Sequence, residues 1–169
     1  GWLLKDPHAC GGWHIRRATA RRAAAQGQRY FQRQVAGTPM SATFIANGRD
    51  ARVLGFNRLI VFRRGIRPFG FCGAIGPVPL SAALTGTIAG IVRQLSATFT
   101  LKGLCSLDFI DDANHASVLE VNPRPPASIG LYAGQPLMRA HANACLHGTL
   151  PQRPDTASDV RGLQIVFAP

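Results

Sequence analysis

The chain has 169 residues, 46% of them hydrophobic, and its 19 basic and 8 acidic side chains give a formal charge of +11. This composition suits one globular domain and excludes a disordered chain. The longest apolar runs, such as 82–92, contain glycine and threonine and fall short of the roughly 20 residues that a membrane-spanning helix needs. We therefore expect no membrane span and a single domain over residues 1–169, in which 150–169 form a C-terminal tail with a short strand.

Charge and cysteine usage narrow the choice of partner and compartment. The positive charge is nearly all arginine, and it favours an anionic partner, such as nucleic acid, phosphate or carboxylate, without saying which. The four cysteines lie far apart and form no C-x-x-C pair, which argues against a zinc knuckle or a redox motif. We therefore expect reduced thiols and a cytoplasmic protein.

The beginning of the chain predicts a strand and then a helix. Residues 1–5 have the character of a strand end rather than of a signal peptide, and no initiating methionine precedes them, so we expect a fragment that lacks the N-terminal part of its fold. Residues 16–26 are rich in alanine and arginine, which favour helix, and Gly27 supplies a stop. We predict a helix with a strongly basic face there.

Residues 40–60 carry the clearest β pattern. Apolar and β-branched residues cluster at 40–45 and 51–60, and the sequence Asn-Gly-Arg-Asp at 47–50 has the composition of a tight turn. We predict an antiparallel hairpin. Residues 63–79 are dense in glycine, proline and phenylalanine without clear periodicity, which predicts a loop-rich connection with room for one short strand.

The second half predicts two helices and three strands. Within 81–100, apolar residues recur at three- and four-residue steps and indicate a helix with one buried stripe. Strands are predicted at 104–110 and 117–122, where apolar and β-branched residues cluster. A further helix at 136–147 and a strand at 162–167 complete the elements. Strands that arrive as hairpins, with helices between them, predict an α+β fold with a mainly antiparallel sheet packed with helices.

Two acidic residues, Asp108 and Glu120, fall on neighbouring strands of the second half. Side chains alternate between the faces of a strand, so if Ile110 pairs with Val118, Asp108 stands directly opposite Glu120. Like charges at that Cβ spacing, about 4.5–5.5 Å, repel each other, and a shared proton, a nearby arginine or a divalent cation could compensate. Asn122 adds a neutral oxygen on the same face, and two carboxylates with one amide suit Mg²⁺. The pattern is equally compatible with solvated residues on an exposed hairpin face.

The segment around these acidic residues resembles the C-terminal signature of ATP-grasp enzymes. The resemblance rests on residues 103–110 followed by Val-Leu-Glu-Val-Asn-Pro-Arg-Pro at 118–125. It implies that Asp108, Glu120 and Asn122 bind the magnesium ions of ATP, with Glu120 bridging two of them. It also implies that Arg124 faces the transferred phosphate or an acyl phosphate, a role that the planar guanidinium suits because it pairs with phosphate oxygens at two points.

The beginning of the chain is similar to two further parts of that family. Lys5, followed by Gly11 and Gly12, is similar to the strand lysine and the glycine-rich flap over the phosphates. The resemblance implies that Lys5 contacts an ATP phosphate and that backbone amides near the two glycines donate hydrogen bonds to phosphate. His14 follows the glycines, and we expect it to reach a phosphate as well.

Residues 30–37 resemble the segment that lines the adenine pocket in ATP-grasp enzymes. The resemblance implies that Gln32, Gln34 and Val35 contact the nucleotide, with the backbone near Gln34 and Val35 reading the base edge. Arg33 and Pro39 stand where many relatives have acidic residues, which puts ribose recognition in doubt. A degenerate, non-catalytic ATP-grasp domain is therefore one alternative function.

The function implied by the resemblance is that of an ATP-dependent ligase, related to biotin carboxylase, which joins a carboxylate to an amine through an acyl phosphate. Its cofactors are ATP and Mg²⁺, its partners are small-molecule carboxylates and amines, and a homodimer is one assembly open to it. A basic nucleic-acid-binding module that uses the arginines of 16–22 is a second alternative, although no aromatic side chains interleave with them to stack on bases. His141 and Cys145 lie four residues apart and are interpreted as helix packing rather than a metal site.

Overall fold

The computed structural model describes residues 1–9, 11–19, 28–62, 68–113, 115–152 and 162–165. Within these residues the chain forms two antiparallel sheets, two α-helices and one 3-10 helix. The elements in chain order are β1 (Trp2–Lys5), β2 (Arg16–Arg17), β3 (Tyr30–Arg33), β4 (Thr38–Asn47), β5 (Ala51–Phe62), β6 (Gly70–Gly76), α2 (Ala82–Phe99), β7 (Lys102–Asp111), β8 (Ala116–Asn122), η1 (Ala127–Tyr132), α3 (Leu137–His147) and β9 (Gly162–Ile165). The predicted α+β fold with a mainly antiparallel sheet is confirmed.

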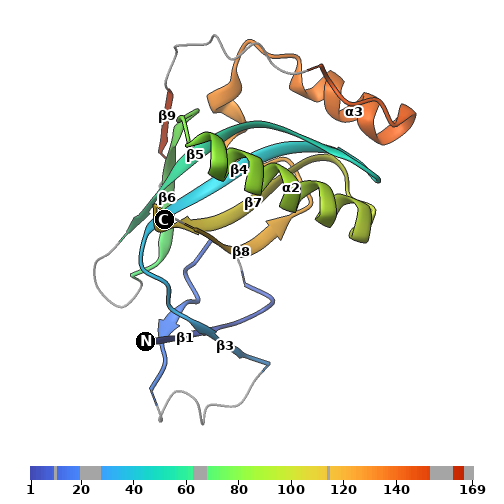
Figure 1. Cartoon of the computed structure of the whole chain (residues 1–169). Helices are drawn as coiled ribbons and strands as arrows, with labels where there is room; N and C mark the ends of the chain where they lie inside the picture. The colour runs from blue at the N-terminus through green and yellow to red at the C-terminus, as the bar shows by residue number, and fades with distance from the viewer. Residues whose placement is uncertain (10, 20–27, 63–67, 114, 153–161, 166–169) are drawn as a thin grey trace.

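The larger sheet has six strands in the order β8-β7-β4-β5-β6-β9 (Figure 1). Its centre is the predicted β4–β5 hairpin, whose turn is closed by the Asn47 side chain: Oδ1 accepts hydrogen bonds from the N–H groups of Arg49 at 3.1 Å and Asp50 at 2.8 Å. The glycine-rich stretch that we expected to be mostly loop instead contributes β6, a full strand paired with both β5 and β9. Glycine lowers strand propensity, so pairing with two neighbours overrides local preference there.

The β7–β8 pair confirms that Asp108 stands opposite Glu120, but not the register from which we derived it. Ile110 pairs with Ser117 rather than with Val118, because a β-bulge follows Asp108. A bulge places two residues of one strand against one of the other. The pairing of Asp108 with Glu120 lies on the far side of the bulge and is therefore unaffected by it.

Helices cover both faces of the large sheet, and each face has its own core. The predicted helix α2 packs on one face, where Phe44, Leu107 and Phe109 are fully buried beneath Ile88 and Val92. The predicted helix α3 and the 3-10 helix η1 pack on the opposite face, and Figure 1 shows α2 and α3 well separated. Because α3 and η1 occupy only one end of that face, the other end is left for the second sheet. Neither α2 nor α3 has the length and apolar character to span a membrane.

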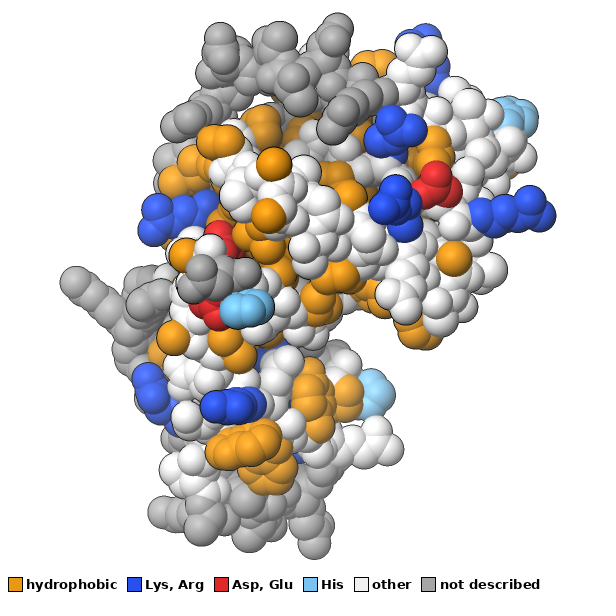
Figure 2. Space-filling model, viewed as in Figure 1, with side chains coloured by type: hydrophobic (Ala, Val, Ile, Leu, Met, Phe, Trp, Pro, Cys, Tyr) orange, Lys and Arg blue, Asp and Glu red, His pale blue; other side chains and the backbone are white. Residues whose placement is uncertain are grey.

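The smaller sheet has three strands in the order β2-β1-β3. Arg16 and Arg17 belong to β2, where they pair with Leu4 and Leu3, so our prediction that a helix begins at Arg16 is wrong. Residues 20–26 of the predicted helix lie outside the described residues. Backbone pairing with β1 outweighs the helix propensity of this segment. Figure 2 shows hydrophobic side chains on the surface of the lower part of the molecule, the part in which Figure 1 labels β1 and β3. Trp2 of β1 is 57% exposed.

A short connection, residues 34–37, leads from the small sheet to the large one. Gly37 within it has a φ of +141°, and a Cβ there would lie against the Asp111 carbonyl oxygen and Ile110. Only glycine fits so close to a neighbouring backbone. The tight connection holds the small sheet beside the open end of the large sheet.

Candidate functional site

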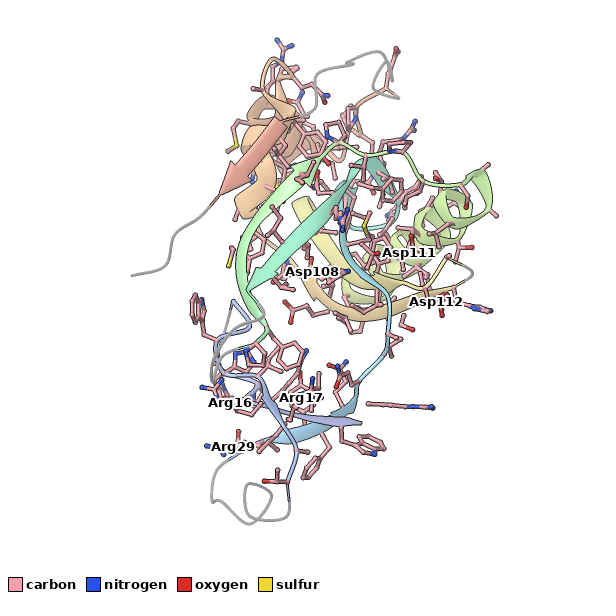
Figure 3. The ribbon with its side chains drawn as sticks, turned by 90° about the vertical axis from the view of Figure 1, so that its left-hand side faces the viewer. Arg16, Arg17, Arg29, Asp108, Asp111 and Asp112 are labelled. Atoms are coloured by element: carbon pink, nitrogen blue, oxygen red, sulfur yellow. The ribbon has the colours of Figure 1, made fainter. Side chains whose placement is uncertain are left out.

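A cleft of about 680 Å³ lies between the two sheets. In Figure 3, Asp108 on the large sheet and Arg17 on the small sheet stand on its two sides, and both line it. Every residue for which the sequence predicted a role also lines this cleft. These are Lys5, Gly11, Gly12, His14, Gln32, Gln34, Val35, Asp108, Glu120, Asn122 and Arg124. The structure thus brings together residues that are more than 100 positions apart in the sequence.

The acidic group lies on the β7–β8 pair, where Asp108 stands opposite Glu120 and Ser106 stands opposite Asn122. Burial and the neighbouring Glu120 carboxylate raise the pKa of Asp108 to about 6, although a hydrogen bond with Ser41 opposes this shift. The Asn122 amide donates a hydrogen bond to Glu120 Oε1 at 3.4 Å. Two carboxylates and an amide therefore lie close together, and the raised pKa of Asp108 reflects the cost of ionising a buried carboxyl group beside a second carboxylate.

Two basic side chains face this acidic group from different elements. Lys5 on β1 is only 5% exposed, and burial lowers its pKa while Glu120 and Asp108 act in the opposite direction. Arg124, just after β8, is exposed, and its charge favours the ionised form of Asp108. Within the part of the chain that the structure describes, Lys5 has no side-chain hydrogen bond, and a buried lysine in that state is well placed to receive an anionic ligand.

The glycine loop between β1 and β2 closes over the cleft by contacting β6. The Gly11 carbonyl oxygen accepts a hydrogen bond from the Phe71 N–H at 2.9 Å, next to the part of β6 that pairs with β9. A Cβ on Gly12 would collide with the Phe69 carbonyl oxygen, and a Cβ on Gly70 would lie 3.4 Å from three carbons of the Trp13 indole. Glycine is thus required at position 12 by this contact, which the sequence did not predict.

His14 follows the loop and carries an unsatisfied group. Its ring atom Nδ1 is buried and has no hydrogen-bond partner among the residues that the structure describes. Buried polar atoms in proteins are nearly always hydrogen-bonded, so one without a partner on a cleft wall points to a missing ligand or water. Its position is consistent with the predicted contact to a phosphate.

The predicted adenine segment lines the cleft on and after β3. The Gln34 N–H already donates to the Gly1 carbonyl oxygen at 2.9 Å. It is therefore not available to a base, and the backbone of Val35 is the better candidate to read the base edge. Arg33 and Pro39, which depart from the family pattern, line the cleft too.

The donor set fits a hard divalent cation that shares its coordination shell with a ligand. Asp108, Glu120 and Asn122 offer oxygen atoms only. Burial and the Glu120 carboxylate raise the pKa of Asp108 although Arg124 and Lys5 act in the opposite direction, so a further cation would favour its ionised form. Among the described residues, no group of three histidine, cysteine or acidic side chains could enclose a metal by itself. A magnesium ion here would complete its shell with water and phosphate oxygens, as Mg²⁺ usually does.

The cleft also has a floor of small polar side chains that the sequence did not single out. Ser41, Ser106 and Ser128 line it and are each 5% exposed or less. Alternation along β4 and β7 would have placed Ser41 and Ser106 on the face of Asp108. Ser128 belongs to η1, and no sequence pattern indicated its position.

His141 and Cys145 lie away from the cleft and serve packing, as predicted. His141 Nδ1 accepts a hydrogen bond from the Leu104 N–H at 2.9 Å, and the Cys145 sulfur lies 3.9 Å from His141 Nε2. Among the described residues these side chains form no metal site. They attach α3 to β7.

The sequence and the fold both match known proteins. The family model for the ATP-grasp domain matches residues 1–128, and no curated protein matches the chain. The structure is similar to a Campylobacter jejuni biotin carboxylase described as a β,γ-ATP complex (TM-score 0.69, 14% identity, 90% of this chain and 38% of that one). It is also similar to the biotin carboxylase domain dimer of the Hydrogenobacter thermophilus 2-oxoglutarate carboxylase, in complex with MgADP and bicarbonate. For this structure the TM-score is 0.68 and the identity 16%, over 89% of this chain and 37% of that one. A third similar structure is that of the L-amino acid ligase of Bacillus licheniformis, with a TM-score of 0.65 and 15% identity over 85% of this chain and 38% of that one.

The chain spans well under half the length of these three proteins, between 37% and 38%. At identities of 14–16% the structural likeness shows a shared fold, and the relatives with that fold are ligases and carboxylases. The match of the family model covers most of the 169 residues, including the glycine loop and the strands that carry Asp108 and Glu120. The chain therefore belongs to the ATP-grasp family.

Proposed function

We propose that this chain binds Mg-ATP in the cleft and takes part in joining a carboxylate to an amine through an acyl phosphate. The observation that carries the proposal is the meeting of opposite charges from both sheets in one cleft. Asp108 and Glu120 come from the large sheet, and Lys5, beside the glycine loop, comes from the small one. A polyanion with its cation suits such a site, because the cation neutralises the carboxylates while the phosphates receive the lysine.

The phosphates of ATP would lie between the glycine loop and β8. Lys5 Nζ would contact a phosphate oxygen as a point charge, and backbone N–H groups near Gly11 and Gly12 would donate to others. The buried ring nitrogen of His14, Nδ1, would form a hydrogen bond with an oxygen of the same phosphates. Gln32, Gln34 and Val35 would line the adenine at the far end of the cleft.

Asp108, Glu120 and Asn122 would hold magnesium at the other end of the phosphate chain, with Glu120 between two ions. Bound Mg²⁺ would neutralise charge on the β- and γ-phosphates and fix their orientation. The chain's own contribution is to exclude water beneath the glycine loop and to keep both carboxylates on one face. This arrangement stabilises charge chiefly by position.

The reaction itself would proceed in two steps. A substrate carboxylate oxygen attacks the γ-phosphorus, the bond to the β,γ-bridging oxygen breaks, and ADP leaves. An amine nitrogen then attacks the acyl carbon, inorganic phosphate leaves with the bonding electrons, and the nitrogen loses a proton. Arg124 would bind oxygens of the transferred phosphoryl group in both steps, where its planar guanidinium can make two parallel hydrogen bonds.

Two of the similar structures support the proposed nucleotide and the proposed class of reaction. One is a complex with MgADP and bicarbonate, and another is an amino acid ligase. The first is also a domain dimer, which favours a homodimer here. A cytoplasmic location belongs to the same proposal.

Trapping the acyl phosphate with hydroxylamine tests this function. The complete protein is incubated with Mg-ATP, hydroxylamine and individual carboxylic acids, and both ADP and hydroxamate are measured. The proposal predicts equal amounts of ADP and hydroxamate with the preferred acid, and neither product with Glu120→Ala. Tight binding of Mg-ATP without hydroxamate from any acid would instead support a degenerate, non-catalytic ATP-grasp domain.

A further inference from the structure

Two large side chains occupy the centre of a turn that ends the glycine loop. The Ile15 N–H donates to the Gly12 carbonyl oxygen at 3.2 Å, and this bond makes Trp13 and His14 the two central residues of the turn. The Trp13 ring lies against β6, whereas His14 lines the cleft. The two neighbouring side chains therefore contact different parts of the molecule.

The Trp13 indole lies flat over the backbone of β6. A Cβ built on Gly70 would lie 3.4 Å from each of the ring carbons Cδ2, Cε2 and Cε3, so the face of the ring, not its edge, covers this residue. Beside it, the Phe71 N–H donates to the Gly11 carbonyl oxygen at 2.9 Å. Alanine would still fit beneath the indole at position 70, but a branched side chain would have to displace the ring.

The backbone of the turn is held by Arg16, the first residue of β2 (labelled in Figure 3). The Arg16 guanidinium donates to the Trp13 carbonyl oxygen at 2.7 Å and to the Ile15 carbonyl oxygen at 2.9 Å. These two carbonyl groups lie on either side of His14 in the sequence. Arg16 thus fixes the shape of the turn, while the indole fixes where the turn lies on β6.

The imidazole of His14 carries the polar atom of this turn that lacks a partner. Its Nδ1 is buried, and among the described residues none forms a hydrogen bond with it. Buried polar atoms are nearly always hydrogen-bonded, so this atom points to a molecule bound in the cleft. Trp13 itself is not among the described residues that line the cleft. Any effect of its indole on a bound molecule therefore has to pass through the turn.

We infer that Trp13 is a positioning residue: by resting on Gly70, its indole holds the turn against β6 and keeps the His14 imidazole directed to the phosphates of the nucleotide. The inference rests on the proposed function and deepens it, because it names the contact that keeps the glycine loop in its binding conformation. Without the indole the turn is free to leave β6. His14 then moves with it, since Arg16 joins the backbone on both sides of that residue.

Calorimetric titration of the complete protein with Mg-ATP tests the inference through a double-mutant cycle. His14→Ala removes one hydrogen bond to a charged group and should weaken binding about 10- to 100-fold. Trp13→Ala should weaken binding to a similar extent, although its ring touches no phosphate. The double variant should bind no more weakly than the weaker of the two single variants, because both changes remove the same interaction.

Three further variants separate positioning from a merely structural role. Trp13→Phe retains a flat apolar ring and should restore the affinity for Mg-ATP to within about threefold of that of the unaltered protein. Gly70→Val should displace the indole and reproduce the loss seen with Trp13→Ala, while β6 is retained because valine favours a strand more than glycine does. Trp2→Ala is the matched control, since Trp2 is 57% exposed and is not among the described residues that line the cleft. It should leave the affinity unchanged.

Adenosine, which carries no phosphate, provides a second reading of the same variants. Its dissociation constant should be the same in the unaltered protein and in Trp13→Ala, because adenosine would meet the segment 32–35 and not His14. A parallel loss of adenosine binding would show that the indole supports the whole cleft rather than the position of His14, and would overturn the inference.

The outcomes distinguish the inference from the function on which it rests. Losses that multiply in the double variant would show that Trp13 and His14 act independently, and unchanged affinity in either single variant would show that its side chain has no part in binding. Each of these results overturns the inference and leaves the proposed Mg-ATP site standing. Absence of Mg-ATP binding by the unaltered protein would overturn the proposed function, and the inference with it.

Discussion

Asp108 shows how much of the site's chemistry resides in one residue. Its carboxyl group is largely buried beside Glu120, and these two features raise its pKa from 3.8 to about 6. Because the folded-state pKa is the higher one, the folded protein binds this proton more tightly than the unfolded chain. Asp108 therefore costs stability progressively as the pH rises through the interval between the two values. Above it, the folded protein carries a poorly compensated carboxylate.

Asp108→Asn should accordingly stabilise the protein without ligand while weakening its response to Mg-ATP. At pH 7 the free energy of unfolding is expected to rise by about 1–2 kcal/mol, less than the full pKa shift would give because the side chain is not completely shielded from water. Thermal unfolding with and without Mg-ATP measures both effects. A variant that is less stable without ligand than the unaltered protein would contradict this account of Asp108.

Cys105 provides a second test at the scale of single residues. The side chain is fully buried, and burial, together with Cys145, raises its pKa to about 11. The thiolate is the reactive form of cysteine. Iodoacetamide at pH 8 should therefore modify the partly exposed Cys72 and Cys145 well before Cys105 in the folded protein, as measured by mass spectrometry of peptides. Equal rates at all three would show that the core around Cys105 opens readily.

Single residues were predictable from the sequence where a motif fixes their spacing, and not where a contact spans the chain. Asp108, Glu120 and Asn122 lie within one hairpin, so alternation along strands places them together. Asn57 and Ser128 are 71 positions apart, and nothing local in either segment indicates that they meet. Their contact depends on η1 returning to the sheet.

At the scale of elements, the glycine loop is the part whose conformation matters most for the proposed binding of the nucleotide. Gly12 has a φ of +74°, and a side chain there would collide with the Phe69 carbonyl oxygen. Gly12→Ala should displace the loop from β6 and lower the affinity for Mg-ATP about tenfold or more, because a strained loop no longer presents its amides to the phosphates. Isothermal titration on the complete protein measures this affinity.

Gly86→Ala is the matched control for that substitution. Gly86 lies in α2, and no described heavy atom comes within 4 Å of the added Cβ. Alanine should therefore stabilise the helix by about 0.5–1 kcal/mol and leave Mg-ATP affinity unchanged. Equal affinities for both variants would mean that the contact between the loop and β6 has no role in binding.

The elements also show where sequence patterns succeed and where tertiary pairing overrides them. The periodic helix α2 and the hairpin β4–β5 were predicted because their patterns are long and regular. Arg16 and Arg17 were expected in a helix, but their backbone pairs with β1. Likewise, β6 is a strand because β5 and β9 flank it, despite its glycines.

At the scale of the whole molecule, the proposed function depends on two sheets that face each other across one cleft. The α+β class followed from strands arriving as hairpins, whereas the way the small sheet faces the large one could not be read from the sequence. Only the resemblance to ATP-grasp enzymes predicted that Lys5 and Asp108 share a site. The formal charge of +11 left nucleic-acid binding open as an alternative, and that alternative assigns no role to the acidic group in the cleft.

Calorimetric titration of the complete protein with Mg-ATP, compared with its Glu120→Ala variant, tests the central claim most directly. Stabilisation by a ligand follows its affinity for the folded state, so the same two proteins are also compared by thermal unfolding. The account predicts that the unaltered protein binds Mg-ATP and gains thermal stability from it, and that both effects are lost in Glu120→Ala. Unchanged binding and unchanged stabilisation in the variant would contradict a magnesium-nucleotide site at this cleft.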